Sequence, residues 1–210
     1  MKIGILALQG DFAEHAAMIQ RLGVEAVEVR LPEQLRDLDG LIIPGGESTT
    51  IGKLATEYEL MDPLRAFGQQ KAIWGTCAGA IFLSKNANRQ QPLLGLMDIT
   101  IERNAFGRQV ASFEVDIEVP ALKLVDKANP PYHCVFIRAP LIEKIAGTAQ
   151  ALASLPDGRI VAAQQGRLLA TSFHPELTPD DRFHRYFLLL SKQAAGQSAQ
   201  QSAQQASGSG

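Results

Sequence analysis

The sequence lacks the features that mark several large classes of protein. Its 210 residues include two cysteines, Cys77 and Cys134, which are too few for a disulfide framework or a zinc cluster. No apolar run approaches the length of a membrane span. The opening apolar run, Lys2 to Leu8, is too short for a signal peptide and has no small-residue cleavage site. We therefore expect a cytoplasmic protein with no membrane partner.

An excess of charge of one sign is also missing. The chain carries 20 Lys and Arg against 22 Asp and Glu, for a net charge of −2. A polyanion-binding protein needs a basic surface, and this balance gives no sign of one, so we expect no nucleic acid partner. The hydrophobic fraction of 46% is ordinary for a globular protein.

The C-terminal stretch lacks large apolar and charged side chains altogether. Residues 193–210 consist of Gln, Ala, Ser and Gly. Such a composition buries too little apolar surface to offset the entropy of ordering, which predicts a disordered tail. Residues 1–192 are then expected to form one domain.

What the sequence does contain is an alternation of strand and helix signals in its first half. Strands are expected at 2–8, 24–29, 39–43 and 72–74, with helices between them and a further helix from Ala78. This alternation predicts an α/β fold with an open, mostly parallel, doubly wound sheet. Polar–apolar alternation over 98–119, with turn signals at Asp157-Gly158 and Gln165-Gly166, predicts antiparallel additions. A last helix is expected to be capped near Thr178-Pro179.

The segment around Cys77 carries the strongest chemical signal. A short apolar strand runs into Gly75-Thr76-Cys77-Ala78-Gly79 and then into a helix. This is the pattern of a nucleophile elbow, in which small residues let the backbone turn sharply around an exposed nucleophile. We predict Cys77 as the nucleophile and the Ala78 amide as an oxyanion donor. The alternative is a buried structural cysteine in a packing turn.

A thiol nucleophile needs a base, and His174 is the best of the four histidines. It ends an apolar strand and opens His174-Pro175-Glu176, in which extended geometry would set Glu176 beside the ring. Cys, His and carboxylate together form an activated-nucleophile triad. His15 and His184 are expected to be solvated or half-packed helix residues, and His133 is expected to meet water.

A glycine-rich loop follows another strand, at Pro44-Gly45-Gly46-Glu47-Ser48. Loops at the carboxyl ends of strands line the ligand cleft of open α/β sheets, so Gly46 is the candidate for the second oxyanion donor. Nucleotide binding is disfavoured, because no P-loop Lys and no Gly-x-Gly-x-x-Gly turn are present.

Taken together, these motifs resemble the class I (triad-type) glutamine amidotransferases, which have a flavodoxin-like sheet. Within that class the chain is most similar to the family of glutaminase subunits of pyridoxal 5′-phosphate synthase. The resemblance rests on six segments in the family's order: Leu8–Asp11, Pro44–Thr50, Gly75–Gly79, Glu102–Gln109, Phe136–Pro140 and Ser172–Leu177.

The resemblance implies a reaction and a set of site residues. Such proteins hydrolyse L-glutamine to glutamate and ammonia through a cysteine thioester. Cys77, His174 and Glu176 would be catalytic, and the Gly46 and Ala78 amides would form the oxyanion hole. The implied substrate-binding residues are Gly46, Glu47, Ser48, Arg103, Ile137 and Arg138, and Gln9 is a further candidate beside them.

The resemblance also implies a partner. The ammonia would pass to a barrel-shaped synthase subunit within a large hetero-oligomer, and the isolated glutaminase would be nearly silent until docked. The chemistry requires no metal and no organic cofactor, since pyridoxal 5′-phosphate would be the product of the complex.

Three other interpretations stay open on the sequence alone. The chain could serve a different amidotransferase complex, which residues 103–109 and 136–140 would distinguish. It could be a peptidase or stress-response hydrolase on a related fold. It could be a glutaminase-like scaffold without activity, although the intact triad argues against that.

Overall fold

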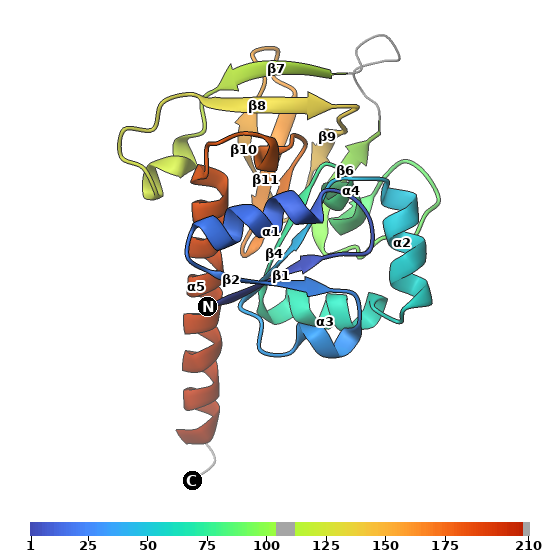
Figure 1. Ribbon diagram of the computed structural model, residues 1–210, viewed down its shortest axis with the longest axis vertical. Helices are drawn as coiled ribbons and strands as arrows, with labels where there is room; N and C mark the ends of the chain where they lie inside the picture. The colour runs from blue at the N-terminus through green and yellow to red at the C-terminus, as the bar shows by residue number, and fades with distance from the viewer. Residues whose placement is uncertain (104–111, 208–210) are drawn as a thin grey trace.

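A computed structural model describes residues 1–103 and 112–207 of the chain, with side chains as far as residue 196 at the C-terminal end. Within that part of the chain, ten strands form one sheet in the order β2-β1-β3-β4-β12-β11-β9-β6-β5, and β10 pairs with β11 (Figure 1). Two further strands, β7 and β8, form a separate ribbon.

The first half of the chain builds the parallel part of the sheet. Its strands are β1 (Lys2–Leu6), β2 (Glu25–Val29), β3 (Gly40–Ile43), β4 (Ala72–Thr76) and, from the end of the chain, β12 (Leu168–Thr171). Neighbouring strands in the order β2-β1-β3-β4-β12 are all parallel. This is the flavodoxin-like 2-1-3-4-5 order, in which ligands bind at the carboxyl ends of the strands.

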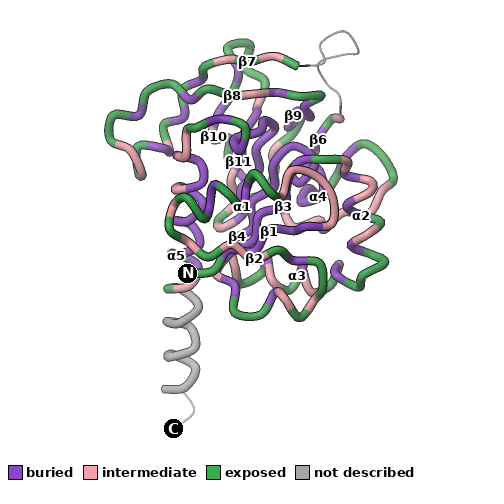
Figure 2. The backbone as a smooth tube through the Cα atoms, viewed as in Figure 1, coloured by how far each residue is buried: buried purple, intermediate pink, exposed green. Residues whose placement is uncertain are grey.

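Helices cover both faces of this sheet. On one face, α2 (Ser48–Glu57), α3 (Met61–Gln70) and α4 (Ala78–Leu83) pack against Leu41, Ile43 and Ile73. On the other face, α1 (Phe12–Arg21) and α5 (Arg182–Ser207) pack against Ile3, Ile42 and Trp74. The sheet therefore separates two apolar cores, and its central strands are the most deeply buried part of the molecule (Figure 2).

The second half adds the antiparallel strands that the turn signals predict. They are β6 (Met97–Glu102), β9 (Leu141–Ile145), β10 (Gln150–Ser154) and β11 (Ile160–Gln165), with β5 (Ser84–Asn86) parallel to β6 at the edge. The ribbon consists of β7 (Ser112–Ile117) and β8 (Tyr132–Ile137). The described residues also form three short 3₁₀ turns, at Pro32–Leu35, Pro120–Leu124 and Pro175–Leu177. The predicted fold class is confirmed.

The boundaries of α5 differ from those that the sequence predicts. Thr178 does not cap α5. Its hydroxyl donates to the carbonyl of Pro175 in the preceding turn, and the Asp180 carboxylate accepts the Arg182 N–H where α5 begins. At its other end α5 continues to Ser207, where the composition predicts a disordered tail from Gln193. Ala and Gln are good helix formers, a preference that the argument from burial ignores. The proposed division of the chain at residue 192 stays a prediction.

None of the helices in the described ranges combines the length and the apolar content that crossing a membrane needs.

Candidate active site

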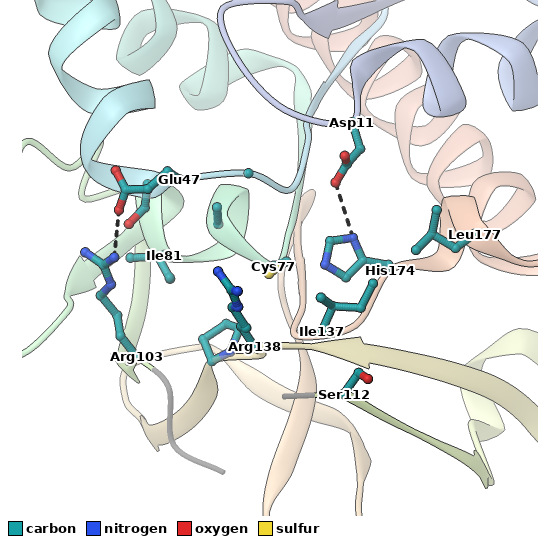
Figure 3. A pocket seen from close by; sticks show the side chains of 14 residues that line it. Asp11, Glu47, Cys77, Ile81, Arg103, Ser112, Ile137, Arg138, His174 and Leu177 are labelled. Carbon is teal, nitrogen blue, oxygen red and sulfur yellow. Dashed lines mark hydrogen bonds and ion pairs between the residues drawn. The ribbon is translucent and has the colours of Figure 1, made fainter. Parts of the chain in front are cut away.

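A pocket of about 660 Å³ opens at the carboxyl ends of the parallel strands (Figure 3). The chain segments that follow β1, β3, β4, β8 and β12 all reach it. Its lining is Asp11, Gly46, Glu47, Ser48, Cys77, Ala78, Ile81, Arg103, Ser112, Ile137, Arg138, Pro140, His174 and Leu177. Residues 104–111, on which part of the Glu102–Gln109 motif falls, lie outside the described residues.

Cys77 sits in a strained turn between β4 and α4. Its φ is 46°, a value that non-glycine residues rarely adopt, and such strain is common at reactive residues. A Cβ on Gly75 would come within 2.5 Å of the Gly79 carbonyl, and one on Gly79 within 2.0 Å of the Ile43 carbonyl oxygen. Both glycines are therefore required for the close backbone packing that the elbow pattern predicts.

The turn also leaves a backbone donor beside the thiol. The N–H of Cys77 donates to the carbonyl oxygen of Thr171 at 2.8 Å, so it is already used. The next residue, Ala78, opens α4, and the first N–H groups of a helix have no partner within the helix. Ala78 lines the pocket next to Cys77.

His174 joins the thiol to a buried carboxylate. Its Nδ1 lies 2.7 Å from Oε1 of Glu176 and 3.6 Å from Oδ2 of Asp11. Its side chain also hydrogen-bonds to Cys77. The backbone of His174 is extended, as expected before proline, and this brings the side chains of residues 174 and 176 together. The three predicted triad residues are thus in contact, with Glu176 behind the ring rather than in the pocket lining.

The environment of His174 favours its charged form. Burial by itself lowers the pKa of His174, but the hydrogen bonds and charges of Cys77 and Glu176 outweigh it and raise that pKa to about 10. At neutral pH the imidazole therefore carries two protons and lies beside the sulfur. This arrangement sets a positive charge beside the sulfur, which suits a cysteine nucleophile.

The turn after β1 hydrogen-bonds to the glycine-rich loop and supports it. The Asp11 N–H donates to the Gly45 carbonyl at 3.2 Å, and the Glu47 N–H donates to Oε1 of Gln9 at 2.6 Å. Gly46 has φ +144°, and a Cβ there would lie 2.5 Å from the same Gln9 oxygen. Gln9 is not part of the pocket lining: its side chain supports the loop that carries Gly46.

Two arginines reach the pocket in different ways. Arg103 donates to Glu47 Oε1 at 2.7 Å, to Thr49 Oγ1 at 3.0 Å and to Gln91 Oε1 at 2.9 Å. Partial burial raises the pKa of Glu47, but the Thr50 N–H and Arg103 outweigh it and lower that pKa. Arg138, by contrast, makes no ion pair with any described residue and points into the pocket (Figure 3).

Arg138 shares with Cys77 an unusual backbone. Its φ is 46°, in the left-handed region, where it follows the end of β8. Strained non-glycine residues persist where the surrounding structure holds them, and this one turns a cationic side chain into the cavity.

Sequence reasoning missed two buried histidines behind the site. His15 and His184, expected to be solvated or half-packed, are both 0% exposed. His15 Nε2 lies 3.3 Å from Glu176 Oε2, and its Nδ1 lies 3.0 Å from His184 Nε2. Helical spacing could have predicted the burial of His15, because His15 lies three and four residues before Met18 and Ile19 on the buried face of α1. The histidine at 133 is exposed, as expected, between Glu114 and Asp116.

One group of potential metal ligands occurs among the described residues. Ligand atoms of Asp11, His174 and Glu176 lie within 4.8 Å of one another. The imidazole is already hydrogen-bonded to Glu176 and to Cys77, which suits a triad better than a metal centre. The expected absence of a metal stays a prediction.

The sequence is similar to those of known glutamine amidotransferases. Residues 5–192 match the SNO glutamine amidotransferase family. The chain is 57% identical over 199 residues to the pyridoxal 5′-phosphate synthase subunit PdxT of Herpetosiphon aurantiacus, covering 90% of this chain and 100% of that one. It is 55% identical over 195 residues to the subunit of the same name from Chloroflexus aurantiacus, again with 90% and 100% coverage.

Solved structures agree with these sequence matches. A crystal structure described as a glutamine amidotransferase aligns with a TM-score of 0.84 and 51% identity, covering 90% of this chain and 98% of that one. A putative GMP synthase subunit from Thermoplasma acidophilum aligns with a TM-score of 0.67 at 18% identity, over 96% and 98% of the two chains, and shows a shared fold.

Proposed function

The chain belongs to the SNO glutamine amidotransferase family, and from that membership and the pocket we propose that it is a glutaminase that supplies ammonia for pyridoxal 5′-phosphate synthesis. The observation that carries the chemistry is the contact of Cys77 with an imidazole that Glu176 holds in its charged form. The observation that carries the pathway is the 55–57% identity to subunits named for that synthase.

The first half of the proposed reaction forms a thioester. The Cys77 thiolate attacks the side-chain amide carbon of L-glutamine, and the carbonyl oxygen becomes an oxyanion. The Ala78 and Gly46 amides stabilise that charge, which is the largest single contribution in many acyl transfers. His174 then gives its proton to the amide nitrogen, ammonia leaves, and the glutamyl group remains on the sulfur.

The second half releases glutamate. His174, now neutral, takes a proton from a water molecule that attacks the thioester carbon. The intermediate collapses with the sulfur as leaving group, which restores the thiolate–imidazolium pair. Glu176 keeps the ring in one orientation and stabilises its charge through both halves.

The charged side chains that line the pocket match the α-carboxylate and the α-ammonium group of glutamine. The Arg138 guanidinium suits the α-carboxylate of glutamine, since planar guanidinium groups bind carboxylates with two hydrogen bonds. The Glu47 carboxylate suits the α-ammonium, and Arg103 acts by holding Glu47 in place. Ser48 and Ile137 also line the pocket, and Gln9 acts through the loop that carries Gly46.

Ammonia must reach its acceptor without meeting bulk water, so the proposal includes a partner, the synthase subunit. The relatives are named as subunits of pyridoxal 5′-phosphate synthase, which supports this pairing. We further propose a large hetero-oligomer with the barrel-shaped synthase, in the cytoplasm, without nucleic acid or membrane.

The test is glutamate release from L-glutamine, measured with and without the synthase subunit, with Cys77→Ala as the blank. Hydrolysis that needs Cys77 and rises when the synthase is added is the expected result. Cys77→Ala should fold and bind the synthase as the unmodified chain does. Equal activity without the synthase would argue against that partner, and turnover by Cys77→Ala would overturn the nucleophile.

A further inference from the structure

A buried polar chain lies behind the triad, and the reaction steps above do not use it. It links His184 on α5, His15 on α1 and Thr76 on β4 to Glu176, and the first three residues are 0% exposed. The His15 Nε2 lies 3.3 Å from Glu176 Oε2 and 3.2 Å from Thr76 Oγ1. Its other nitrogen lies 3.0 Å from His184 Nε2.

Glu176 needs such a neighbour on its second oxygen. Oε1 is occupied by His174, and the side chain of Glu176 is wholly buried. Oε2 has no well-aligned hydrogen bond from any described residue, and the His15 nitrogen at 3.3 Å faces it. A buried carboxylate oxygen without a donor is costly, and it favours protonation of the carboxyl group. A donor at this point offsets that cost.

The contacts of the two histidines decide which nitrogens carry protons. If His15 were protonated on Nδ1 alone, its Nε2 lone pair would face the Glu176 oxygen, which is repulsive. His184 would then have to accept at Nε2 and place its proton on Nδ1, an atom with no partner. In the opposite assignment, His184 donates from Nε2 to His15 Nδ1, and the Nε2–H of His15 faces Thr76 and Glu176. The unpaired atom of the two rings is then His184 Nδ1, which carries no proton in this tautomer.

Both rings are held neutral in fixed orientations. Burial lowers the pKa of His15 to about 3, although Glu176 acts in the opposite sense and His184 and His174 add to the lowering. Burial, with a smaller effect of Arg21, lowers the pKa of His184 to about 3. Trp74 packs edge-on against both rings, at centroid distances of 5.6 and 4.9 Å.

We propose that His15 is a positioning residue of the triad: with His184 setting its tautomer, it places its Nε2–H between Thr76 Oγ1 and Glu176 Oε2 and so keeps the Glu176 carboxylate aimed at His174. The proposal rests on the proposed function, since it assigns a role within the same triad. His15 is not part of the pocket lining, so its effect on the reaction acts through Glu176.

The matched substitutions are His15→Gln and His15→Asn. The glutamine amide can reach the place of Nε2 and donate to Glu176, whereas the shorter asparagine amide reaches only the place of Nδ1. We expect His15→Asn to lower kcat by about 10- to 100-fold, as loss of an orienting partner commonly does, with KM nearly unchanged. His15→Gln should recover most of that loss. Both are assayed with the synthase subunit present.

The pH profile separates positioning from packing. Without the donor, Glu176 stabilises the charged His174 ring beside Cys77 less well, so the acid limb of kcat/KM moves to higher pH in His15→Asn but not in His15→Gln. Ile19→Ala, a buried change on the same helix, should lower stability without moving that limb. The proposal would be overturned if the acid limb stayed in place in a folded His15→Asn variant. It would also be overturned if the acid limb moved by the same amount in His15→Gln.

Two further measurements keep the proposal testable if a variant fails to fold or if glutamine is not the substrate. The pH midpoint for alkylation of Cys77 by iodoacetamide should rise in His15→Asn, whatever the substrate is. Cys134 should not interfere, because it is 0% exposed and burial raises its pKa. Thr76→Val keeps His15 and should leave the acid limb where it is or move it to lower pH. A move to higher pH would assign the role to Thr76 instead and overturn the proposal.

Discussion

Cys77 and Arg138 both have φ of 46°, and both line the same pocket. In each case the strained residue comes directly at or after the end of a strand, where the sheet holds its backbone on one side. A relaxed backbone would aim either side chain elsewhere, so the strain belongs to the geometry of the site.

Replacement of His174 tests the catalytic role of a single residue. In the proposed mechanism it both protonates the leaving ammonia and activates water. His174→Asn should therefore lower kcat for glutamine hydrolysis by about 10³- to 10⁴-fold, as loss of a triad member does elsewhere. Glutamate release with the synthase subunit present is the measurement.

The matched control is His133→Asn. That histidine is exposed on β8 and paired with Glu114 and Asp116. It should hydrolyse glutamine like the unmodified chain. A loss of only a few-fold in His174→Asn would assign that residue a structural role.

At the scale of elements, the packing of α4 against β3 positions the nucleophile. Gly79 lies in α4 with no room for a Cβ, which would meet the Ile43 carbonyl oxygen at 2.0 Å. Gly79→Ala should lower the free energy of unfolding by about 1–3 kcal/mol, as overpacking does, measured by urea denaturation.

Gly196 provides the comparison, because it is also helical and a Cβ there meets no atom within 4 Å. Gly196→Ala should be neutral or stabilise by up to about 1 kcal/mol, since alanine favours helix. If the two substitutions had equal effects, the close approach of α4 to β3 would be wrong.

The C-terminal end of α5 gives a second prediction for an element. Ala194 is 2% exposed, so a chain that ends at Lys192 loses a buried methyl group, whereas one that ends at Gly196 keeps it. We expect the chain that ends at Gly196 to keep the melting temperature of the full-length protein. The free energy of unfolding of the chain that ends at Lys192 should be lower by about 1 kcal/mol. A large drop on removing 197–210 would show that the last turns contribute to the packed structure.

For the molecule as a whole, the two buried neutral histidines predict acid sensitivity. Burial holds the pKa values of His15 and His184 at about 3 in the folded state, below the value of 6.5 for an unfolded histidine. The unfolded chain then binds more protons between pH 6.5 and 3. Their contribution to stability is therefore complete above pH 6.5 and is lost as the pH falls toward 3.

The measurement is the free energy of unfolding in urea across this range. His184→Gln removes one titrating group and should flatten the slope by up to about 1.4 kcal/mol per pH unit. The control is His133→Gln: Asp116 and Glu114 raise the pKa of His133, so its removal should not flatten the acid slope. An unchanged slope in His184→Gln would contradict the burial of a neutral ring.

The sequence by itself determined the features that depend on near neighbours in the chain. The elbow around Cys77, the required glycines at 75 and 79, and the pairing of His174 with Glu176 each lie within a few residues. Steric limits on the backbone act over that range, so the pattern alone is informative. The alternation of strands and helices likewise predicted the parallel sheet.

Only the tertiary structure decided the contacts between distant segments. The His15–His184 contact joins residues 169 positions apart, and the His15–Thr76 contact joins residues 61 apart. The positions of Gln9 and Gln91 likewise depend on tertiary contacts, the first under the glycine-rich loop and the second on Arg103. A polar residue in a helix is expected to be solvated unless the element packed against it is known. The sheet brings α1, α5 and the turn after β12 together, and that packing converts two ordinary histidines into buried neighbours of the triad.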